Sequence, residues 1–158
     1  MLGKDPNMEI TNLKKEAIPE VSELIVSGEP YVLPHHDYVY WIMEEYFSSS
    51  NYIVTDSNRI IGFICALPSL DKKCYFIWQI VVASDYRGKK IASLLVNRII
   101  EEAKLKAFNR LELSIHGENE ASQKLFERIA KENNSTLNKI DEYRSKNYHE
   151  YVYSIELA

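Results

Sequence analysis

The most informative stretch of this sequence is Val81-Val82-Ala83-Ser84-Asp85-Tyr86-Arg87-Gly88-Lys89-Lys90-Ile91-Ala92-Ser93-Leu94-Leu95. It joins an apolar, β-branched run to a segment with helical hydrophobic spacing, which predicts a strand, a turn and a helix. A turn that opens a helix presents backbone N–H groups and the positive end of the helix dipole, and both favour an anion. Gly88 permits close backbone approach, and Arg87, Lys89 and Lys90 add positive charge. We therefore expect a phosphate-bearing ligand here, although a basic, solvated helix start explains the charge alone at least as well.

The elements around this turn follow from apolar spacing and turn-forming residues. Before it we expect a strand over 9–12, a helix from Pro19 to Ser27 ended by Gly28, a helix from about Asp37 to Phe47, a hairpin of 51–55 and 59–67, and a strand over 74–82 buried on both faces. After it we expect a helix through 92–103, a strand over 111–115, a helix capped by Asn119, and two strands within 137–157.

Length and composition predict one folded domain over 1–158. The chain has 158 residues, 46% hydrophobic and 27% charged, which is typical of globular proteins. Residues 1–7, ahead of a second methionine, are expected to be a frayed end or a cloning remnant without function. The net charge of -4 argues against a nucleic-acid partner and fits a cationic substrate better.

Cysteine and histidine placement predicts neither a disulfide framework nor a metal site. The two cysteines and four histidines show no ligand spacing; they are Cys65, Cys74, His35, His36, His116 and His149. The longest apolar run, Ile60 to Leu67, is too short to cross a bilayer, and the N-terminus lacks an apolar signal region. We therefore expect a cytoplasmic protein without a membrane partner.

The turn resembles the acetyl-CoA signature of the GNAT N-acetyltransferase superfamily, Q/R-x-x-G-x-G/A, in the form Arg87-Gly88-Lys89-Lys90-Ile91-Ala92. Gly62 before it and Asn119 after it resemble the family's other landmarks, and the likeness covers about Ile53 to Ala130. The resemblance implies an α+β, three-layer α/β/α fold, with a mixed, mostly antiparallel sheet of six or seven strands and about four helices. It also implies acetyl-CoA as co-substrate and no metal.

Two positions depart from the family pattern. Lys90 stands where the family has glycine. A requirement for positive φ there would weaken ligand binding, whereas at negative φ the side chain can point away or reach a phosphate, and we expect the change to be tolerated. Phe126 stands where many members have a tyrosine that can protonate the departing thiolate. A thiol with a pKa of about 8.5 leaves tolerably as a thiolate, so this change need not abolish activity.

Within the superfamily the sequence is most similar to the diaminobutyrate acetyltransferases. The similar stretches are Phe76 to Val82, Leu111 to Ile115, Asn119 to Phe126 and His149 to Ile155, and this subfamily also has phenylalanine at the position of Phe126. The subfamily's Asp-x-Asn-Ser stretch has no counterpart in Leu33 to Asp37. The acceptor therefore stays open between a small diamino acid, a protein N-terminus, a lysine, a polyamine and an aminoglycoside, and a non-catalytic acyl-CoA sensor is a further alternative.

The resemblance implies direct attack of the amine on the thioester in a ternary complex. Residues expected to contact acetyl-CoA are Ile80, Val81, Val82, Arg87, Gly88, Lys89, Lys90, Ile91, Ala92, Ser93, Asn119, Ser122 and Phe126. The candidate bases for the amine are Glu112 and Glu150, although each is equally well read as a solvated surface glutamate. Tyr31, Tyr38, Trp78 and Gln79 are the candidate acceptor-binding residues. Dimers are common on this fold, so a homodimer is a further expectation.

Overall fold

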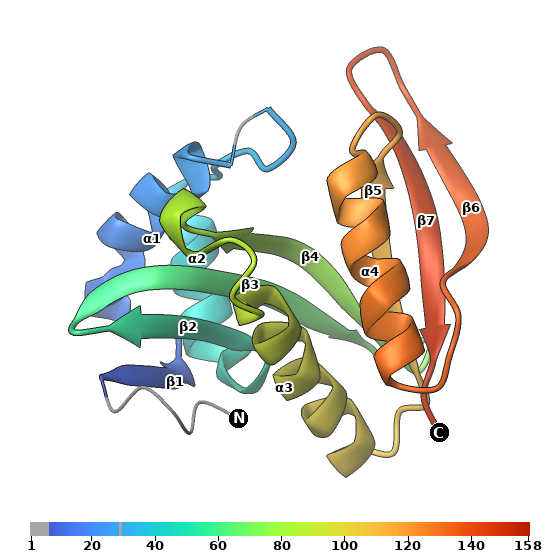
Figure 1. The fold of residues 1–158 in the computed structure, drawn as a ribbon, viewed down its shortest axis with the longest axis horizontal. Helices are drawn as coiled ribbons and strands as arrows, with labels where there is room; N and C mark the ends of the chain where they lie inside the picture. Colours follow the sequence, from blue (N-terminus) through green and yellow to red (C-terminus); the bar gives the residue numbers. More distant parts are fainter. Residues whose placement is uncertain (1–6, 29) are drawn as a thin grey trace. The chain divides into compact units, whose positions relative to one another are not determined.

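The computed structural model describes residues 7–28 and 30–158, which form four α-helices and seven strands (Figure 1). In chain order they are β1 (Met8–Asn12), α1 (Ile18–Val26), α2 (Asp37–Tyr46), β2 (Asn51–Asp56), β3 (Arg59–Ser69), β4 (Cys74–Val82), α3 (Ile91–Leu105), β5 (Arg110–His116), α4 (Glu120–Glu132), β6 (Asn138–Arg144) and β7 (His149–Glu156). Short 3-10 turns are η1 (Lys15–Ala17), η2 (Ser48–Ser50) and η3 (Ser84–Tyr86).

The strands form one mixed sheet in the order β1-β2-β3-β4-β5-β7-β6. β4 and β5 pair in parallel, whereas β1 with β2, β2 with β3, β5 with β7, and β6 with β7 are antiparallel. A helix must connect the parallel pair, and α3 does so. This is the mixed, mostly antiparallel sheet that the family resemblance implies.

The chain divides into two compact units, which are described separately below. The first unit comprises the chain up to Ala66 together with Gln79–Ile99, and the second comprises Leu67–Trp78 and Ile100–Ala158. Strand β4 contributes its second half to the first unit and its first half to the second. The single-domain organisation stays a prediction. Of the expected frayed end, residues 1–6 lie outside the described residues, whereas the Asn7 carbonyl accepts a hydrogen bond from the Ser57 N–H over 3.1 Å.

In the first unit, helices cover both faces of β3. Side chains alternate along a strand, so Gly62 and Phe63 face opposite sides. The ring of Phe63 meets Tyr40 of α2 edge-on at 5.9 Å between centroids. On the other face, the backbone at Gly62 lies against Ile91 and Leu95 of α3. The beginning of α3 is therefore fixed closely on β3.

Strand β4 corrects one prediction. Complete burial on both faces was expected from its apolar composition, but burial alternates beyond its first two residues. β-branched and aromatic residues favour strands whether one face of the sheet is covered or both are. The composition of a strand therefore does not show whether one or both of its faces are buried. Half-buried residues lie at even positions of this strand, namely Phe76, Trp78, Ile80 and Val82.

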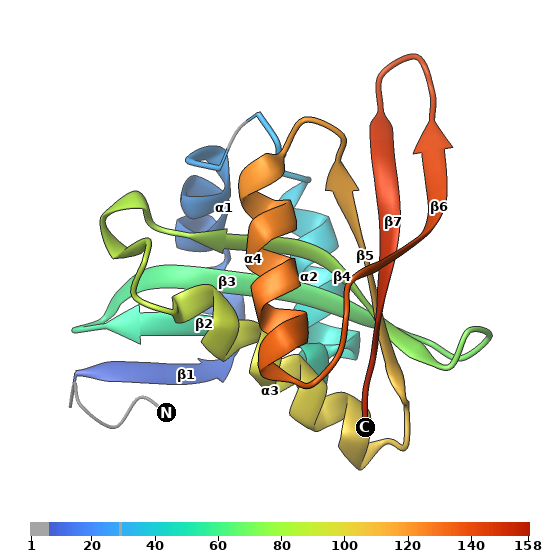
Figure 2. The ribbon, with the colours of Figure 1, turned by 45° about the vertical axis from the view of Figure 1, so that its right-hand side comes forward.

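In the second unit, β5, β7 and β6 lie side by side (Figure 2). β5 pairs with β7 from Arg110 opposite Glu156 to His116 opposite Glu150. Helix α4 begins at the predicted cap, because the Asn119 side chain accepts a hydrogen bond from the Ser122 N–H over 3.1 Å. β6 ends the sheet, and all seven of its residues are exposed.

Candidate active site

The turn before α3 contains two residues with left-handed backbone. Gly88 has φ +78° and Lys90 has φ +64°. Left-handed residues within a turn aim backbone N–H groups into the concavities that bind anions. Glycine takes this conformation without cost, whereas lysine is strained in it. The family's glycine at this position therefore has a conformational reason, and Lys90 satisfies the same geometry under strain.

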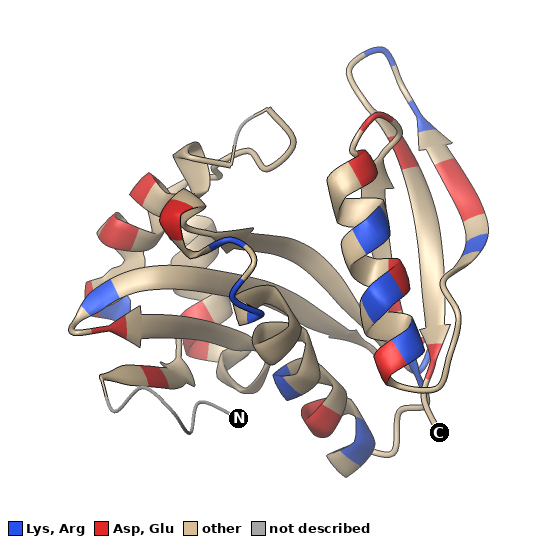
Figure 3. Cartoon of the chain, viewed as in Figure 1, with Lys and Arg blue, Asp and Glu red and all other residues tan. Residues whose placement is uncertain are grey.

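The N-terminus of α3 adds further donors. The Leu94 N–H bonds to the Lys90 carbonyl over 3.1 Å, so the N–H groups of Ile91, Ala92 and Ser93 precede the first helical hydrogen bond. The first turn of α3 carries no acidic residue. Figure 3 shows the basic colour of the turn directly ahead of this helix end. Donors, helix dipole and positive side chains thus coincide at one place.

A polar network connects this turn to the β2–β3 hairpin. The Tyr86 hydroxyl donates a hydrogen bond to Asp56. Arg59 holds Asp85 through two hydrogen bonds of 2.7 and 3.1 Å, which lower the pKa of that carboxyl. The ammonium of Lys89 lies 4.8 Å from the centroid of the Tyr86 ring. Arg59 therefore compensates the negative charge of Asp85 beside the anion-binding turn.

The end of β4 continues beyond its pairing with β5. The parallel ladder covers Tyr75–Ile77 against Leu111–Leu113. Of the three predicted residues at the strand end, Val81 is buried and Ile80 and Val82 are half-buried. Backbone amides beyond a ladder can bind a ligand that itself carries amides, as in strand addition.

The predicted α4 residues are engaged within their own helix. The Asn119 amide donates to Ser122 Oγ over 2.9 Å, in addition to capping the helix. Phe126 is buried on the core face of α4 together with Ile129 and Ala130. Phe126 therefore has an evident packing role in this unit.

The two candidate bases have different surroundings. Glu112 is buried, accepts a hydrogen bond from the Cys74 thiol over 3.0 Å, and lies 3.8 Å from Lys72 and 3.9 Å from Arg110. Two cationic side chains and a thiol therefore surround this carboxylate. The alternative of a solvated surface residue does not hold for Glu112.

Glu150, the second candidate, is partly desolvated. Burial raises its pKa, an effect that the nearby His116 and His149 oppose. Its Oε2 atom is buried, and no described residue makes a hydrogen bond to it. A partly desolvated carboxylate with a raised pKa is suited to accept a proton.

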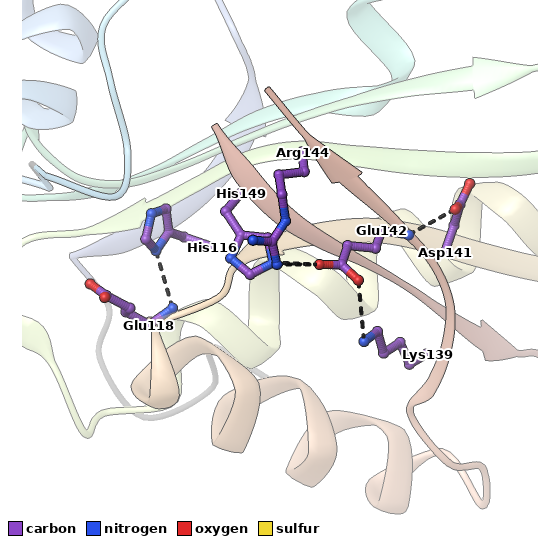
Figure 4. Close-up of polar contacts among 7 residues, drawn as sticks. All are labelled: His116, Glu118, Lys139, Asp141, Glu142, Arg144 and His149. Atoms are coloured by element: carbon purple, nitrogen blue, oxygen red, sulfur yellow. Dashed lines mark hydrogen bonds and ion pairs between the residues drawn. The ribbon is translucent and has the colours of Figure 1, made fainter. Parts of the chain in front are cut away.

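The imidazole next to Glu150 is held in place by the β6–β7 hairpin. Figure 4 shows His149 Nε2 directed at Glu142, whose Oε1 lies 2.6 Å away. Arg144 contacts the same oxygen at 3.0 Å, and these two partners lower the pKa of Glu142. The neighbouring His116 ring accepts a hydrogen bond from the Glu118 N–H (Figure 4). Hydrogen bonds therefore hold both imidazole rings near Glu150 in place.

The four predicted acceptor-binding residues differ in exposure. Tyr31 is 41% and Tyr38 66% exposed, and Tyr38 stacks on Trp41 at 5.6 Å between centroids. Trp78 is half-buried, whereas Gln79 is buried with both amide atoms bonded to protein groups. Tyr31, Tyr38 and Gln79 belong to the first unit and Trp78 to the second.

Two tyrosines with evident roles around the site, Tyr40 and Tyr86, were not predicted. Tyr86 lies inside the quoted turn, where an aromatic residue between charged ones was an available signal. Tyr40 gives no local signal, because its partner Gln79 is 39 positions away.

Metal-ligating clusters and membrane-spanning helices can be assessed for residues 7–28 and 30–158, the part of the chain that the structure describes. In that range no cluster of three or more potential metal-ligating side chains occurs. Within the same part of the chain, no helix combines the length and apolar character that a bilayer crossing requires.

Comparison with curated proteins gives relatives named as diaminobutyric acid acetyltransferases. The L-2,4-diaminobutyric acid acetyltransferase of Shouchella clausii is 36% identical over 95 residues, which are 60% of this chain and 53% of the relative. That of Halalkalibacterium halodurans is 35% identical over 99 residues, 62% of this chain and 52% of the relative. The chain thus spans about half the length of these relatives. They confirm the predicted likeness to this subfamily.

A solved structure shows the fold of this chain, and a family model shows its family. Diaminobutyrate acetyltransferase EctA from Paenibacillus lautus, solved with L-2,4-diaminobutyric acid and coenzyme A, superimposes with a TM-score of 0.80 at 23% identity over 94% of each chain, which confirms the predicted fold. The model of the acetyltransferase (GNAT) family matches residues 18–130, a range that includes the anion-binding turn, the cap of α4 and most of both units. By this match, this chain belongs to the acetyltransferase (GNAT) family.

Proposed function

We propose that this protein transfers the acetyl group of acetyl-CoA to a primary amine of a small diamino acid such as 2,4-diaminobutyrate. The observation that carries the proposal is the turn before α3, where left-handed Gly88 and Lys90 adjoin a helix N-terminus and three basic side chains. That chemistry suits the phosphates of coenzyme A. The names of the curated relatives support the acceptor.

Acetyl-CoA would be held mainly by backbone groups of the first unit. The N–H groups of residues 88–93 and the side chains of Arg87, Lys89 and Lys90 would bind the phosphates. The amides of Ile80 to Val82 would hold the pantetheine arm, and one N–H there would stabilise negative charge developing on the thioester oxygen. Asn119 and Ser122 would contribute from α4 by exchanging their mutual hydrogen bond for one to the ligand.

The chemistry requires a neutral amine. An alkylammonium with a pKa of about 10 is protonated at neutral pH and must lose its proton before it attacks. We propose that Glu150 accepts this proton, because its raised pKa and its buried oxygen suit a base. The amine nitrogen then bonds to the acetyl carbon, the carbon–sulfur bond breaks, and the electron pair leaves with sulfur.

The departing sulfur needs no dedicated acid. The Phe126 side chain has no proton to give, and a thiol with a pKa of about 8.5 is a competent leaving group as the thiolate. Solvent, or the proton released by the amine, would then protonate it. This arrangement predicts activity without a tyrosine at position 126.

The acceptor is proposed as a small diamino acid because the chain is acidic, with a net charge of -4, and its relatives act on one by name. Protein N-termini, lysines, polyamines and aminoglycosides are the competing acceptors. We further propose a cytosolic setting, since both cysteines are free thiols, no nucleic-acid or membrane partner, and a homodimer.

The test is a thiol-release assay with acetyl-CoA and a panel of diamino acids, diamines, polyamines and peptides, with calorimetric titration of CoA. Release with diaminobutyrate or a close relative supports the proposal. Binding of CoA without turnover on any acceptor favours the sensor alternative. No binding of CoA contradicts the proposal altogether.

Two charge-reversal variants test whether the turn itself binds CoA. Arg87→Glu should weaken CoA binding by roughly 10- to 100-fold, since a charge-assisted hydrogen bond is replaced by repulsion. Lys15→Glu in η1 makes the same change of charge outside the turn and should leave the affinity within about twofold. Equal losses in the two variants would point to net charge as the cause and count against the turn.

A further inference from the structure

We propose that Gln79 and Tyr40 are positioning residues for the acceptor amine. Together they hold segment 30–36, the connection that leads into α2, against the second half of β4. The segment so held would set the affinity for the acceptor and leave the affinity for acetyl-CoA unchanged. This inference rests on the proposed acetyl transfer.

The junction is a continuous set of hydrogen bonds. The Gln79 amide donates to the Leu33 carbonyl over 2.7 Å. The Tyr40 hydroxyl donates to Gln79 Oε1 over 3.0 Å and accepts from the His35 N–H over 3.1 Å. Two backbone groups of one segment are thereby fixed to β4 through two side chains.

Burial makes this junction strong. Tyr40 is 0% and Gln79 7% exposed, and the Tyr40 ring packs edge-on against Phe63. Burial also raises the pKa of Tyr40, so its hydroxyl keeps the proton that it donates. Removing one partner would leave buried polar groups unsatisfied, which costs more than a surface hydrogen bond. The segment therefore has one strongly preferred position.

The position of the junction points to the acceptor. Gln79 directly precedes Ile80 to Val82, the backbone proposed to hold the thioester. The beginning of the same connection also approaches this strand, because a Cβ at Gly28 would lie 3.3 Å from a methyl group of Val81. Between these two anchors, Tyr31 and Leu33 remain 41% and 42% exposed. An anchored backbone with exposed side chains beside the reacting group can contact an incoming amine.

The phosphate-binding turn has a separate support. It is connected to the β2–β3 hairpin through Asp56 with Tyr86 and through Arg59 with Asp85. None of these four residues takes part in the Gln79–Tyr40 junction. Loosening segment 30–36 should therefore leave CoA binding intact.

The test compares Tyr40→Phe, Gln79→Leu and the double variant with the unmodified protein. Amide hydrogen exchange should accelerate at His35 and its neighbours in each variant, a readout that does not depend on activity. The KM for the acceptor should rise about tenfold, while kcat and the CoA dissociation constant stay within about twofold. Since both residues serve one junction, the double variant should lose little more than either single one.

Tyr52→Phe is the matched control, because Tyr52 is also buried and its hydroxyl donates to the Ser49 carbonyl over 2.8 Å. It should lower stability similarly without changing the acceptor KM. An unchanged acceptor KM in the junction variants of an active enzyme overturns the inference, as does an equal rise in the control. Absence of transfer by the unmodified protein to every amine tested overturns the proposed function itself, and the acceptor role with it.

Discussion

A Cβ atom added to Gly62 would lie 2.9 Å from Cγ2 of Ile91, so the backbone of β3 touches the first residue of α3. The contacted methyl group is attached directly to the Cβ of Ile91, and a β-branched side chain in a helix strongly prefers one χ1 rotamer, so the methyl group moves away only at a cost. The separation between strand and helix is therefore set by the absence of a side chain at position 62. Because α3 begins directly after the phosphate-binding turn, this packing also fixes the turn.

Gly62→Ala should displace the start of α3, lowering the free energy of unfolding by about 1–3 kcal/mol, as overpacking of a core does. CoA affinity should fall as well. Denaturant unfolding and calorimetry measure the two effects. In an Ile91→Ala background the clash is relieved, so the same substitution should cost much less. An equal cost in both backgrounds would refute a steric cause.

Lys90→Gly should stabilise the protein, because it removes left-handed strain at φ +64°. We expect the free energy of unfolding to rise by roughly 0.5–1 kcal/mol. Left-handed backbone costs a residue other than glycine about 1–2 kcal/mol, and the greater freedom of glycine in the unfolded chain offsets part of the relief. Lys89→Gly removes the same charge at a residue whose φ is not positive and should instead destabilise. Chemical denaturation of both variants checks the contrast, and destabilisation by both would contradict it.

Glu150→Gln should reduce kcat by about 10²–10⁴ without changing CoA affinity, since it removes the proposed base. In the unmodified protein the rate should rise with pH through the pKa of Glu150, which burial places above the usual range. That acidic limb should disappear in the variant. Glu112→Gln provides the comparison: it should lower stability and keep the limb. A limb that persists in Glu150→Gln would exclude Glu150 as the base.

Alkaline pH should destabilise the fold through its buried thiols. Burial raises the pKa of Cys65 from 9.0 to about 12, and that of Cys74 from 9.0 to about 11. The unfolded thiols therefore ionise first, so the stabilisation is complete below pH 9 and is lost as pH rises toward the folded values. Each thiol contributes a slope of about 1.4 kcal/mol per pH unit in that window. Unfolding measured at several pH values should show a shallower decline in Cys65→Ala, and identical slopes would contradict the prediction.

Local patterns predicted most elements of the fold. Asn119 as the cap of α4, the helix beginning near Pro19, and the turn before α3 all depend on neighbours within a few positions. Gly62 was recognised through the family resemblance, and its contact with Ile91 supplies the physical reason. Such features need no knowledge of how distant segments meet.

Features that depend on distant partners were not predictable. Gln79 is a polar residue in an apolar strand, but nothing in the sequence selects Tyr40, 39 positions away, as its partner. The link between Tyr86 and Asp56 spans 30 positions and was likewise missed. The sequence also left the backbone of Lys90 undecided, because a lysine carries no signal for positive φ.

Strand β6 has a consequence for how this protein behaves at high concentration. As one of the two edge strands of the sheet, it offers backbone groups to which another chain could add. Its register shifts between Lys139 and Asp141, and it alternates charges in Lys139, Asp141, Glu142 and Arg144. An irregular, charged edge is a poor template for a further strand, so the sequence of β6 opposes fibrous growth by pairing at this edge.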